Sequence, residues 1–404
     1  MSSSFARLGF PALVTLALLT LAGCRDDESP LAPEPNAATA VSSFQWGVIN
    51  VGGYHTCAVA ADRRGYCWGL NQSGQLGDGT STNRSRPTLV GGGLRWLMIV
   101  PGDGHTCGLT TDSLAYCWGK NREGQLGINS TGSRAKPAPV QGGRHYAQVN
   151  TGGAFSCAVT AAHKAYCWGA NSQGELGDGT TTRRLTPVAV AGSKSFRRVV
   201  AGAAHTCGLT TTNKAFCWGD GDFGKLGDGT GQMRLVPTAV AGGLTFKQVN
   251  PGNAHTCAVG TDARAYCWGH NDSGQLGDGS TTDRSTPHAV GDGRSYTNVV
   301  AGSTYTCGVT GGKRGYCWGD NFTGALGDNS TIDRKVPTAV VGGLNLSGIS
   351  PGSGHHTCAI TPLNELYCWG HNAYGQLGSA TTELCEGLLN LPCSTKPKQV
   401  LAPS

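Results

Sequence analysis

Short apolar segments alternate with glycine-rich polar segments along most of the chain, and the pattern repeats about every 50 residues. In the first unit the apolar positions cluster at 44–51, 55–59, 66–69 and 87–90, and each cluster has the length of a strand rather than a helix. Glycine, proline and asparagine separate the clusters, as turn residues do between strands. The pattern predicts four short β-strands per unit, with the second and third forming a hairpin.

The first predicted strand of each unit carries a large side chain at one register. These residues are Trp46, Trp96, Tyr146, Phe196, Phe246, Tyr296 and Leu346. A fixed period near 50 residues is typical of propellers and solenoids. Four short strands in each of seven units therefore predict an all-β fold, a seven-bladed β-propeller with four antiparallel strands per blade. Whether a blade borrows a strand from its neighbour stays open.

Two cysteines ten residues apart occupy the predicted hairpin of every unit. The pairs are Cys57 with Cys67, Cys107 with Cys117, Cys157 with Cys167, Cys207 with Cys217, Cys257 with Cys267, Cys307 with Cys317, and Cys358 with Cys368. A turn centred on Asp62 places the first pair at facing positions, close enough for a disulfide. The spacing differs from that of the close cysteine pairs in structural zinc sites. We predict one disulfide per blade and an oxidising compartment.

The first forty residues have the features of an export signal and a tether. Arg7 precedes a short apolar segment at 11–20, and LAGC at 21–24 resembles a bacterial lipobox. The resemblance implies a signal peptide at 1–23 and a lipid on Cys24, with an ordinary cleaved signal as the alternative. Arg25 after the cysteine favours the outer membrane or cell surface. Residues 24–40 are acidic and proline-rich, which predicts an extended tether ahead of a propeller at 41–404.

Three motifs make the repeat specific: GxxHTCAV, YCWGxNxxGQLGDGT and the following PxxV. They resemble the regulator of chromosome condensation repeat family over about residues 41–401, and the cysteine pair resembles exported bacterial members. The resemblance implies the same seven-bladed propeller. The family includes a nuclear exchange factor for the Ran GTPase and a secreted β-lactamase inhibitor that binds an enzyme with one face. No residue of the exchange factor's active face matches here, so exchange activity is an analogy only.

Polar residues also recur at fixed registers. Histidine precedes the Thr-Cys in five units (His55, His105, His205, His255 and His356), while Phe155 and Tyr305 replace it in two. Because aromatic rings substitute for histidine, we interpret this register as packing rather than a metal ring. Arginine recurs three residues before the unit's proline, and we predict that it pairs with the turn aspartate; a basic ring for acidic ligands is the alternative. Basic residues at the hairpin tips are interpreted as solvated surface charge.

The residue after Trp-Gly varies among the units and includes residue types that bind divalent metals. The four weak candidates for a metal site come from neighbouring units and are Asp220, His270, Asp320 and His371. An exposed, variable loop position is the other interpretation of this register.

Unit seven departs from the repeat, with eighteen residues between Gly378 and Pro397 where earlier units have nine. The insert contains Cys385 and Cys393, which we predict to form an eighth disulfide. Binding residues concentrate in loops on rigid scaffolds, and exposed aromatic residues often anchor interfaces. The candidate partner-binding residues are therefore Leu388, Leu389 and Leu391 of the insert and Phe223, Phe322 and Tyr374 of the NxxG turns. A cap over the ring closure is the alternative role of the insert.

No phosphate loop, nucleophile elbow or zinc-protease motif is present in the sequence, so we predict neither an enzyme nor a cofactor. The net charge of +6 is modest for a chain of this length and argues against nucleic-acid binding. The sequence favours a monomeric, extracytoplasmic binding scaffold, held to the membrane through its lipid only, for another protein or a cell-envelope glycan. A propeller hydrolase or lyase acting on an envelope polymer is the alternative.

Overall fold

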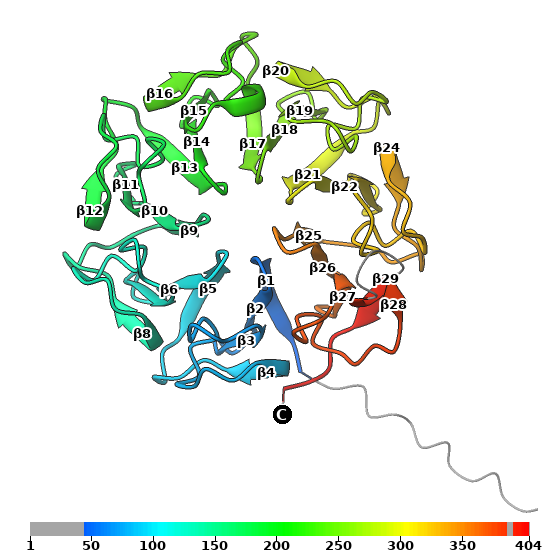
Figure 1. Cartoon of the computed structure of the whole chain (residues 1–404), viewed down its shortest axis with the longest axis horizontal. Coiled ribbons are helices and arrows are strands. Elements are labelled where there is room, and N and C mark those ends of the chain that lie inside the picture. Colours follow the sequence, from blue (N-terminus) through cyan, green and yellow to red (C-terminus); the bar gives the residue numbers. More distant parts are fainter. Residues whose placement is uncertain (1–43, 386–390, 404) are drawn as a thin grey trace, which may run out of the picture. The chain divides into compact units, whose positions relative to one another are not determined.

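Seven antiparallel sheets surround a central axis (Figure 1). The computed structural model describes residues 44–385 and 391–403. Each sheet, or blade, consists of consecutive strands of one repeat, with the first strand innermost and the fourth outermost. The predicted seven-bladed propeller is confirmed, and in the described ranges each blade is built from strands of a single repeat. The predicted signal peptide, the tether with Cys24, and two insert leucines, Leu388 and Leu389, lie outside the described residues.

The strand bounds follow the repeat closely. The innermost strands are β1 (Trp46–Val51), β5 (Trp96–Pro101), β9 (Gln148–Thr151), β13 (Phe196–Ala201), β17 (Phe246–Pro251), β21 (Tyr296–Ala301) and β25 (Gly348–Pro351). The second strands are β2 (His55–Ala60), β6 (His105–Thr110), β10 (Phe155–Val159), β14 (His205–Thr210), β18 (His255–Gly260), β22 (Tyr305–Thr310) and β26 (His356–Ile360).

The outer half of each blade contains the third and fourth strands. The third strands are β3 (Gly65–Gly69), β7 (Ala115–Gly119), β11 (Ala165–Gly169), β15 (Ala215–Gly219), β19 (Ala265–Gly269), β23 (Gly315–Gly319) and β27 (Leu366–His371). The strands that pair with the third strands are β4 (Arg84–Leu89), β8 (Arg134–Pro139), β12 (Arg184–Ala189), β16 (Arg234–Ala239), β20 (Arg284–Ala289), β24 (Arg334–Ala339) and, in blade 7, β29 (Leu391–Gln399). Blade 7 adds a two-residue strand, β28 (Leu384–Cys385), and blade 4 a short 3₁₀ turn, η1 (Asp222–Gly224). Within the described ranges, no helix has the length and apolar character needed to cross a membrane.

The second and third strands of every blade form the predicted hairpin. In blade 1 the turn contains Arg63 in the left-handed region at φ 68°, and Cys57 pairs directly with Cys67. The two Cα atoms of this pair are 4.1 Å apart, which brings the sulfur atoms within bonding distance.

The predicted disulfide is present in every blade, with the same Cα separation of 4.1 Å. In chain order, the bonds join Cys57 to Cys67, Cys107 to Cys117, Cys157 to Cys167, Cys207 to Cys217, Cys257 to Cys267, Cys307 to Cys317, and Cys358 to Cys368. All fourteen cysteines are fully buried. One disulfide per blade is therefore confirmed, with the pairing that the sequence predicted.

The hydrophobic core lies between adjacent blades. Trp118 of blade 2 is fully buried beside Leu76 of blade 1, and its Nε1 donates to the carbonyl of Gln75 at 2.9 Å. The hydroxyl of Thr106 donates to the same carbonyl at 2.7 Å. Gly77 has a φ of +73°, and a Cβ at this position would lie 2.6 Å from Trp118 Nε1. The GQLG motif thus forms the turn of its own blade and also contacts Trp118 and Thr106 of the next blade.

The ring closes through the same contacts that join blades 1 and 2. The hydroxyl of Thr56 and the Nε1 of Trp68, both in blade 1, donate to the carbonyl of Gln376 in blade 7, at 2.8 and 2.9 Å. In Figure 1, β1 lies beside β25 and β26, the inner strands of the last blade. Closure therefore needs no exchanged strand.

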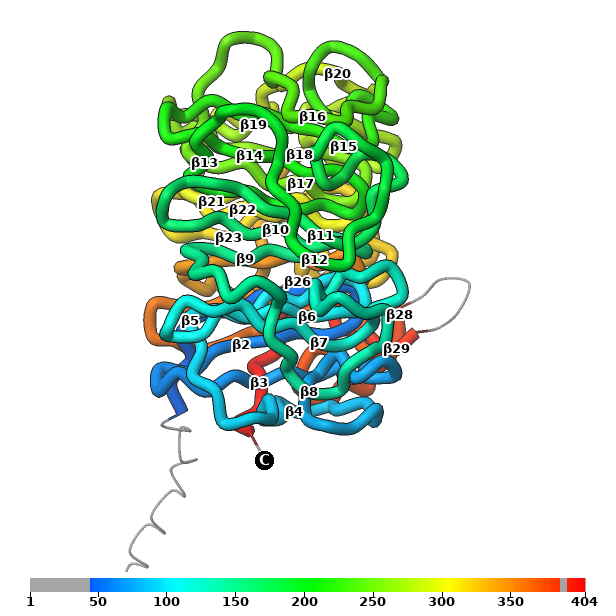
Figure 2. Tube along the Cα trace, turned by 90° about the vertical axis from the view of Figure 1, so that its left-hand side faces the viewer, coloured from blue at the N-terminus to red at the C-terminus, as the bar shows by residue number. Residues whose placement is uncertain are grey.

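The strand connections define two faces of the ring. The connections between first and second strands and between third and fourth strands form one face, which we call the loop face. The hairpin turns between second and third strands form the opposite face, which we call the hairpin face. Figure 2 shows the ring from the side, with β28 and the start of β29 at one face. Because these two segments follow the third strand of blade 7, that face is the loop face.

Candidate functional site

The histidine register forms hydrogen bonds between blades in the interior of the ring. His205 Nε2 lies 2.8 Å from the hydroxyl of Thr256 in the next blade, and that hydroxyl donates to the carbonyl of Lys225. The hydroxyl therefore accepts from Nε2–H, which leaves Nδ1 unprotonated. In all five histidines Nδ1 is buried and has no hydrogen-bond partner in the part of the chain that the structure describes. Burial lowers the pKa of each ring, to about 3 in three of them, and the structural interpretation of this register is confirmed.

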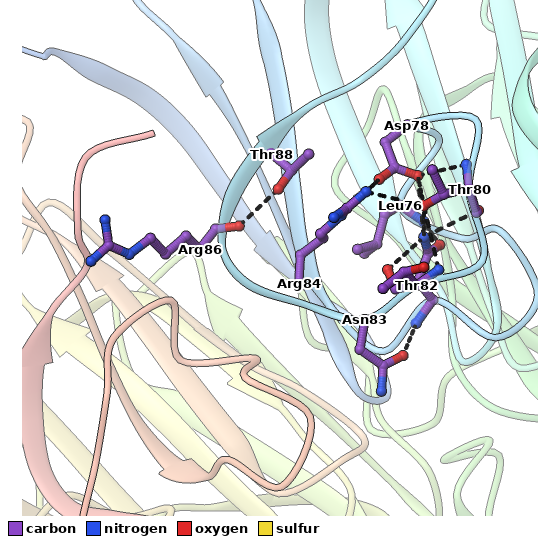
Figure 3. Close-up of polar contacts among 9 residues, drawn as sticks. Leu76, Asp78, Thr80, Thr82, Asn83, Arg84, Arg86 and Thr88 are labelled. Carbon is purple, nitrogen blue, oxygen red and sulfur yellow. Dashed lines mark hydrogen bonds and ion pairs between the residues drawn. The ribbon is translucent and has the colours of Figure 1, made fainter. Parts of the chain in front are cut away.

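Figure 3 shows the loop after the third strand of blade 1. Arg84 forms an ion pair with Asp78 at 2.8 Å, and the Asp78 carboxylate also accepts from the amide and hydroxyl of Thr80. Burial alone would raise the pKa of Asp78, but the hydrogen bonds from Thr80 and Arg84 outweigh it and lower the pKa. The side chain of Asn71 accepts from the amide of Leu76 and donates to nearby loop carbonyls. Together these contacts fix the loop against its own blade.

The predicted arginine–aspartate pairing is confirmed in five blades. The other four pairs are Arg184–Asp178, Arg234–Asp228, Arg284–Asp278 and Arg334–Asp328. In blade 2 the aspartate is replaced, and Arg134 instead donates to the carbonyls of Gly132 and Ser133. Since the paired guanidinium groups are already bound to carboxylates, this register is structural rather than a basic ring for acidic ligands.

The four weak metal candidates lie on the loop face, but the structure does not assemble them into one site. Asp220 pairs with Lys225, and Asp320 accepts from the hydroxyl of Thr304 at 2.8 Å. The two histidines contact aromatic rings, as described next. Among the described residues, no group of three or more His, Cys, Asp or Glu side chains is placed to hold a metal ion. Each candidate instead takes part in contacts within or next to its own loop.

Aromatic and histidine side chains gather on the loop face of blades 6, 7 and 1. We call the group of Phe322, His355, His371, Tyr374 and Tyr54 the aromatic arc. The ring centroids of Tyr54 and Tyr374 are 5.4 Å apart, and those of Phe322 and His355 are 4.8 Å apart. A backbone hydrogen bond from His371 to His355, 2.9 Å long, joins the two halves.

The aromatic arc is largely apolar at neutral pH. Phe322 is 46 % exposed and Tyr54 is 39 % exposed. Burial lowers the pKa of His371 to about 4 and also lowers that of His355, although Asp320 acts in the opposite direction on His355. Both rings are therefore uncharged at pH 7. A similar pair lies apart from the arc in blades 4 and 5, where the ring centroids of Phe223 and His270 are 4.3 Å apart and the two rings are tilted by 47°.

The insert of unit seven borders the aromatic arc. Its β28–β29 hairpin carries the predicted Cys385–Cys393 disulfide, and Cys393 pairs with His371 in the sheet of blade 7. Leu384 is 55 % exposed, whereas Leu391 is only partly exposed. In this blade the disulfide-linked hairpin occupies the position where blades 1, 3, 4, 5 and 6 have their arginine–aspartate pair. We take the arc and the described residues of the insert together as one candidate binding surface on the loop face.

Sequence reasoning identified Phe322, Tyr374 and Leu391 but missed Tyr54, His355 and Leu384 as parts of this surface. Tyr54 and His355 precede the histidine register, where the other five units have glycine, alanine or threonine. Large residues therefore replace small ones only in units one and seven, which are neighbours in the closed ring. This difference between units was a signal in the sequence that could have placed both residues on one surface.

A family model described as the regulator of chromosome condensation (RCC1) repeat matches residues 64–109, 112–159, 163–209, 213–259 and 262–309, more than half of the chain. The chain belongs to the RCC1 repeat family. A second RCC1 repeat model extends the matches to residues 49–75 and 352–376. No curated protein sequence matches the chain.

Solved structures share the propeller fold of this RCC1 repeat protein at low sequence identity. Human WBSCR16 is 20 % identical with a TM-score of 0.70, and the match covers 77 % of this chain and 85 % of that one. Yeast RCC1 (Prp20), solved bound to Kap60, is 21 % identical with a TM-score of 0.69, covering 76 % and 78 %. The ectodomain of the Arabidopsis thaliana receptor kinase ACR4 is 22 % identical with a TM-score of 0.53, covering 81 % and 96 %. At these identities the comparisons establish the fold alone.

Proposed function

We propose that this RCC1 repeat propeller is an exported, lipid-anchored scaffold that binds another protein through the aromatic arc and the adjoining insert. The observation that carries the proposal is the grouping of the exposed rings of Tyr54 and Phe322 and the partly exposed ring of Tyr374 on loops of three adjacent blades, beside the long insert of unit seven. Rings held on a rigid framework lose little conformational freedom on binding, and aromatic residues dominate the energy of protein interfaces.

The rest of the loop face supports this location. Ion pairs hold the long loops of blades 1, 3, 4, 5 and 6 close to their own sheets, as Arg84 and Asp78 do in blade 1. Blade 7 instead extends a disulfide-linked hairpin with the exposed side chain of Leu384. The largest departure from the repeat is therefore next to the most aromatic part of the face.

The chain's disulfides indicate an oxidising, extracytoplasmic compartment. We propose that a lipid on Cys24 attaches the protein to the outer membrane or the cell surface, with the acidic segment at 24–40 as a spacer. The similar ectodomain from Arabidopsis thaliana supports the extracytoplasmic location, because it has the same fold outside a cell. Metabolic labelling with a fatty acid, lost in Cys24→Ser, tests the anchor.

We propose binding without catalysis. Several acidic side chains of the loops are engaged in structural contacts: Asp78 with Arg84, and Asp220 with Lys225. A hydrolase or lyase would need carboxylates free for acid–base work. Turnover of envelope polysaccharides by the purified protein would overturn this part of the proposal.

Replacing both Phe322 and Tyr374 with alanine is expected to weaken partner binding at least tenfold, because two interface anchors are removed. Affinity capture from envelope extract identifies the partner, and titration of that partner against each variant measures the change. Leu363→Ala is the matched control, since Leu363 is 73 % exposed on the hairpin face of blade 7. Equal affinity for the double variant and the unmodified protein would contradict the assigned surface, whereas capture of a glycan alone would replace the protein partner with the envelope polymer.

A further inference from the structure

The innermost strands line a central cavity of about 400 Å³. Asparagine side chains that line the cavity donate hydrogen bonds to backbone carbonyls at the open edges of these strands. Asn50 Nδ2 donates to the carbonyl of Ile99 at 2.8 Å, and Asn250 Nδ2 donates to the carbonyl of Val299 at 2.7 Å. Because unpaired groups of a strand edge need hydrogen-bond partners, these amides have a structural role.

Two charged residues line the cavity, Arg198 and Asp103. Asp103 follows β5 at the loop-face end, where its carboxylate accepts from the hydroxyl of Ser353 at 2.5 Å. Arg198 is the third residue of β13, five positions before Ala203, which occupies the register of Asp103. Five extended residues correspond to about 16 Å of strand, so the two charges belong to opposite ends of the cavity.

Within residues 44–385 and 391–403, no carboxylate forms an ion pair with the guanidinium of Arg198. Its Nε is buried and has no hydrogen-bond partner among the described residues. Burial lowers the pKa of Arg198, and the neighbouring Arg197 adds to the effect, yet an arginine side chain stays charged in proteins. On the next blade, Gln248 donates its amide to Asn298 at 2.7 Å and so forms a neutral polar wall. A partly buried cation in such surroundings is electrostatically unsatisfied.

We propose that the central cavity binds a small monocarboxylate through the guanidinium of Arg198. The planar guanidinium matches the two oxygens of a carboxylate, which it binds through parallel hydrogen bonds. One cation with neutral amides around it balances one negative charge, which favours a carboxylate over a doubly charged phosphate. A volume of about 400 Å³ suits a small molecule. This site is independent of the aromatic arc.

Saturation-transfer NMR with acetate as the probe tests the proposal on the purified, oxidised protein. Acetate is expected to receive saturation from the unmodified protein, and Arg198→Gln is expected to reduce its affinity at least tenfold. Acetamide, a neutral molecule of the same shape, is expected to receive none. Arg197→Gln is the matched control, because it removes the neighbouring charge from an exposed side chain of the same strand.

Two results would overturn the site. One is acetate binding in Arg198→Gln within twofold of the unmodified protein, with both shown to be folded by near-ultraviolet circular dichroism. The other is equal saturation of acetate and acetamide in the unmodified protein, which decides the question even where the variant does not fold.

Discussion

Complete reduction of the disulfides is expected to unfold the propeller in buffer without denaturant. Each blade disulfide closes a loop with a sequence separation of ten residues, worth about 3 kcal/mol in the loop-entropy model. Seven such contributions exceed the net stability of a typical domain, which is about 5–15 kcal/mol. The cysteines are also fully buried in the clusters between blades, so their separation disturbs the core.

The measurement is recovery of the near-ultraviolet circular dichroism of the buried tryptophans after dilution from urea. The oxidised protein is expected to regain its spectrum, and the protein reduced in urea is expected not to regain it. Replacing a single pair, Cys157→Ala with Cys167→Ala, is expected to cost about 3 kcal/mol of unfolding free energy and to leave the ring folded. A fully reduced chain that regains the native spectrum would show that the inter-blade core suffices without the bridges.

Acid is expected to unfold the propeller because of its five buried histidines. Their pKa values in the folded protein are depressed, to about 3 for His55, His105 and His255, whereas an unfolded histidine titrates near 6.5. The contribution of these histidines to the free energy of unfolding is therefore fully present above pH 6.5. It falls as the pH drops toward 3, because in this range only the unfolded state takes up protons. Each histidine contributes up to about 1.4 kcal/mol per pH unit in this window, so five together lower the stability steeply between pH 6.5 and 3.

Urea midpoints measured from pH 7.5 to 4 test this expectation. His205→Phe is expected to flatten the pH dependence by about one fifth, because Phe155 already fills the equivalent position in blade 3 with full burial. His288→Gln, which changes a half-exposed histidine, is expected to leave the dependence unchanged. A His205→Phe variant as acid-sensitive as the unmodified protein would assign the effect to other groups.

The aspartates of the loop pairs extend the sensitivity to lower pH. The pKa of Asp178 is lowered because the hydrogen bonds from Thr180 and Arg184 outweigh the opposing effect of burial. A depressed carboxylate pKa gives stability that is present above about pH 4 and is lost as the pH falls further. The histidines thus determine the first phase of acid unfolding and the aspartates the second.

Much of the fold followed from the sequence because each unit repeats the same local signals. The spacing of Cys57 and Cys67 fixed the hairpin register, and the arginine and aspartate of one loop lie close enough in sequence to suggest their pairing. The contacts between blades could not be predicted from these local signals. The carbonyl of Gln75 accepts from Trp118 of the next unit, and no local pattern reveals a partner that lies 43 residues away.

The candidate binding surface was predicted only in part for the same reason. Phe322 and Tyr374 stood out within their own turns, but their neighbours came from other connections of adjacent blades. Tyr54 meets Tyr374 only because the ring closes, and His355 reaches Phe322 across a blade boundary. Which side chains share a surface is decided by closure of the ring, whereas the repeat pattern describes one unit at a time.

Hydroxyl-radical footprinting of the protein in its native envelope, compared with the purified protein, tests the central claim most directly. The account predicts that Tyr54, Phe322, Tyr374 and Leu384 on the loop face become protected in the envelope, while Leu363 on the hairpin face is oxidised equally in both states. Equal oxidation of the four loop-face residues in both states, or protection confined to the hairpin face, would contradict a scaffold that binds through the aromatic arc and the insert.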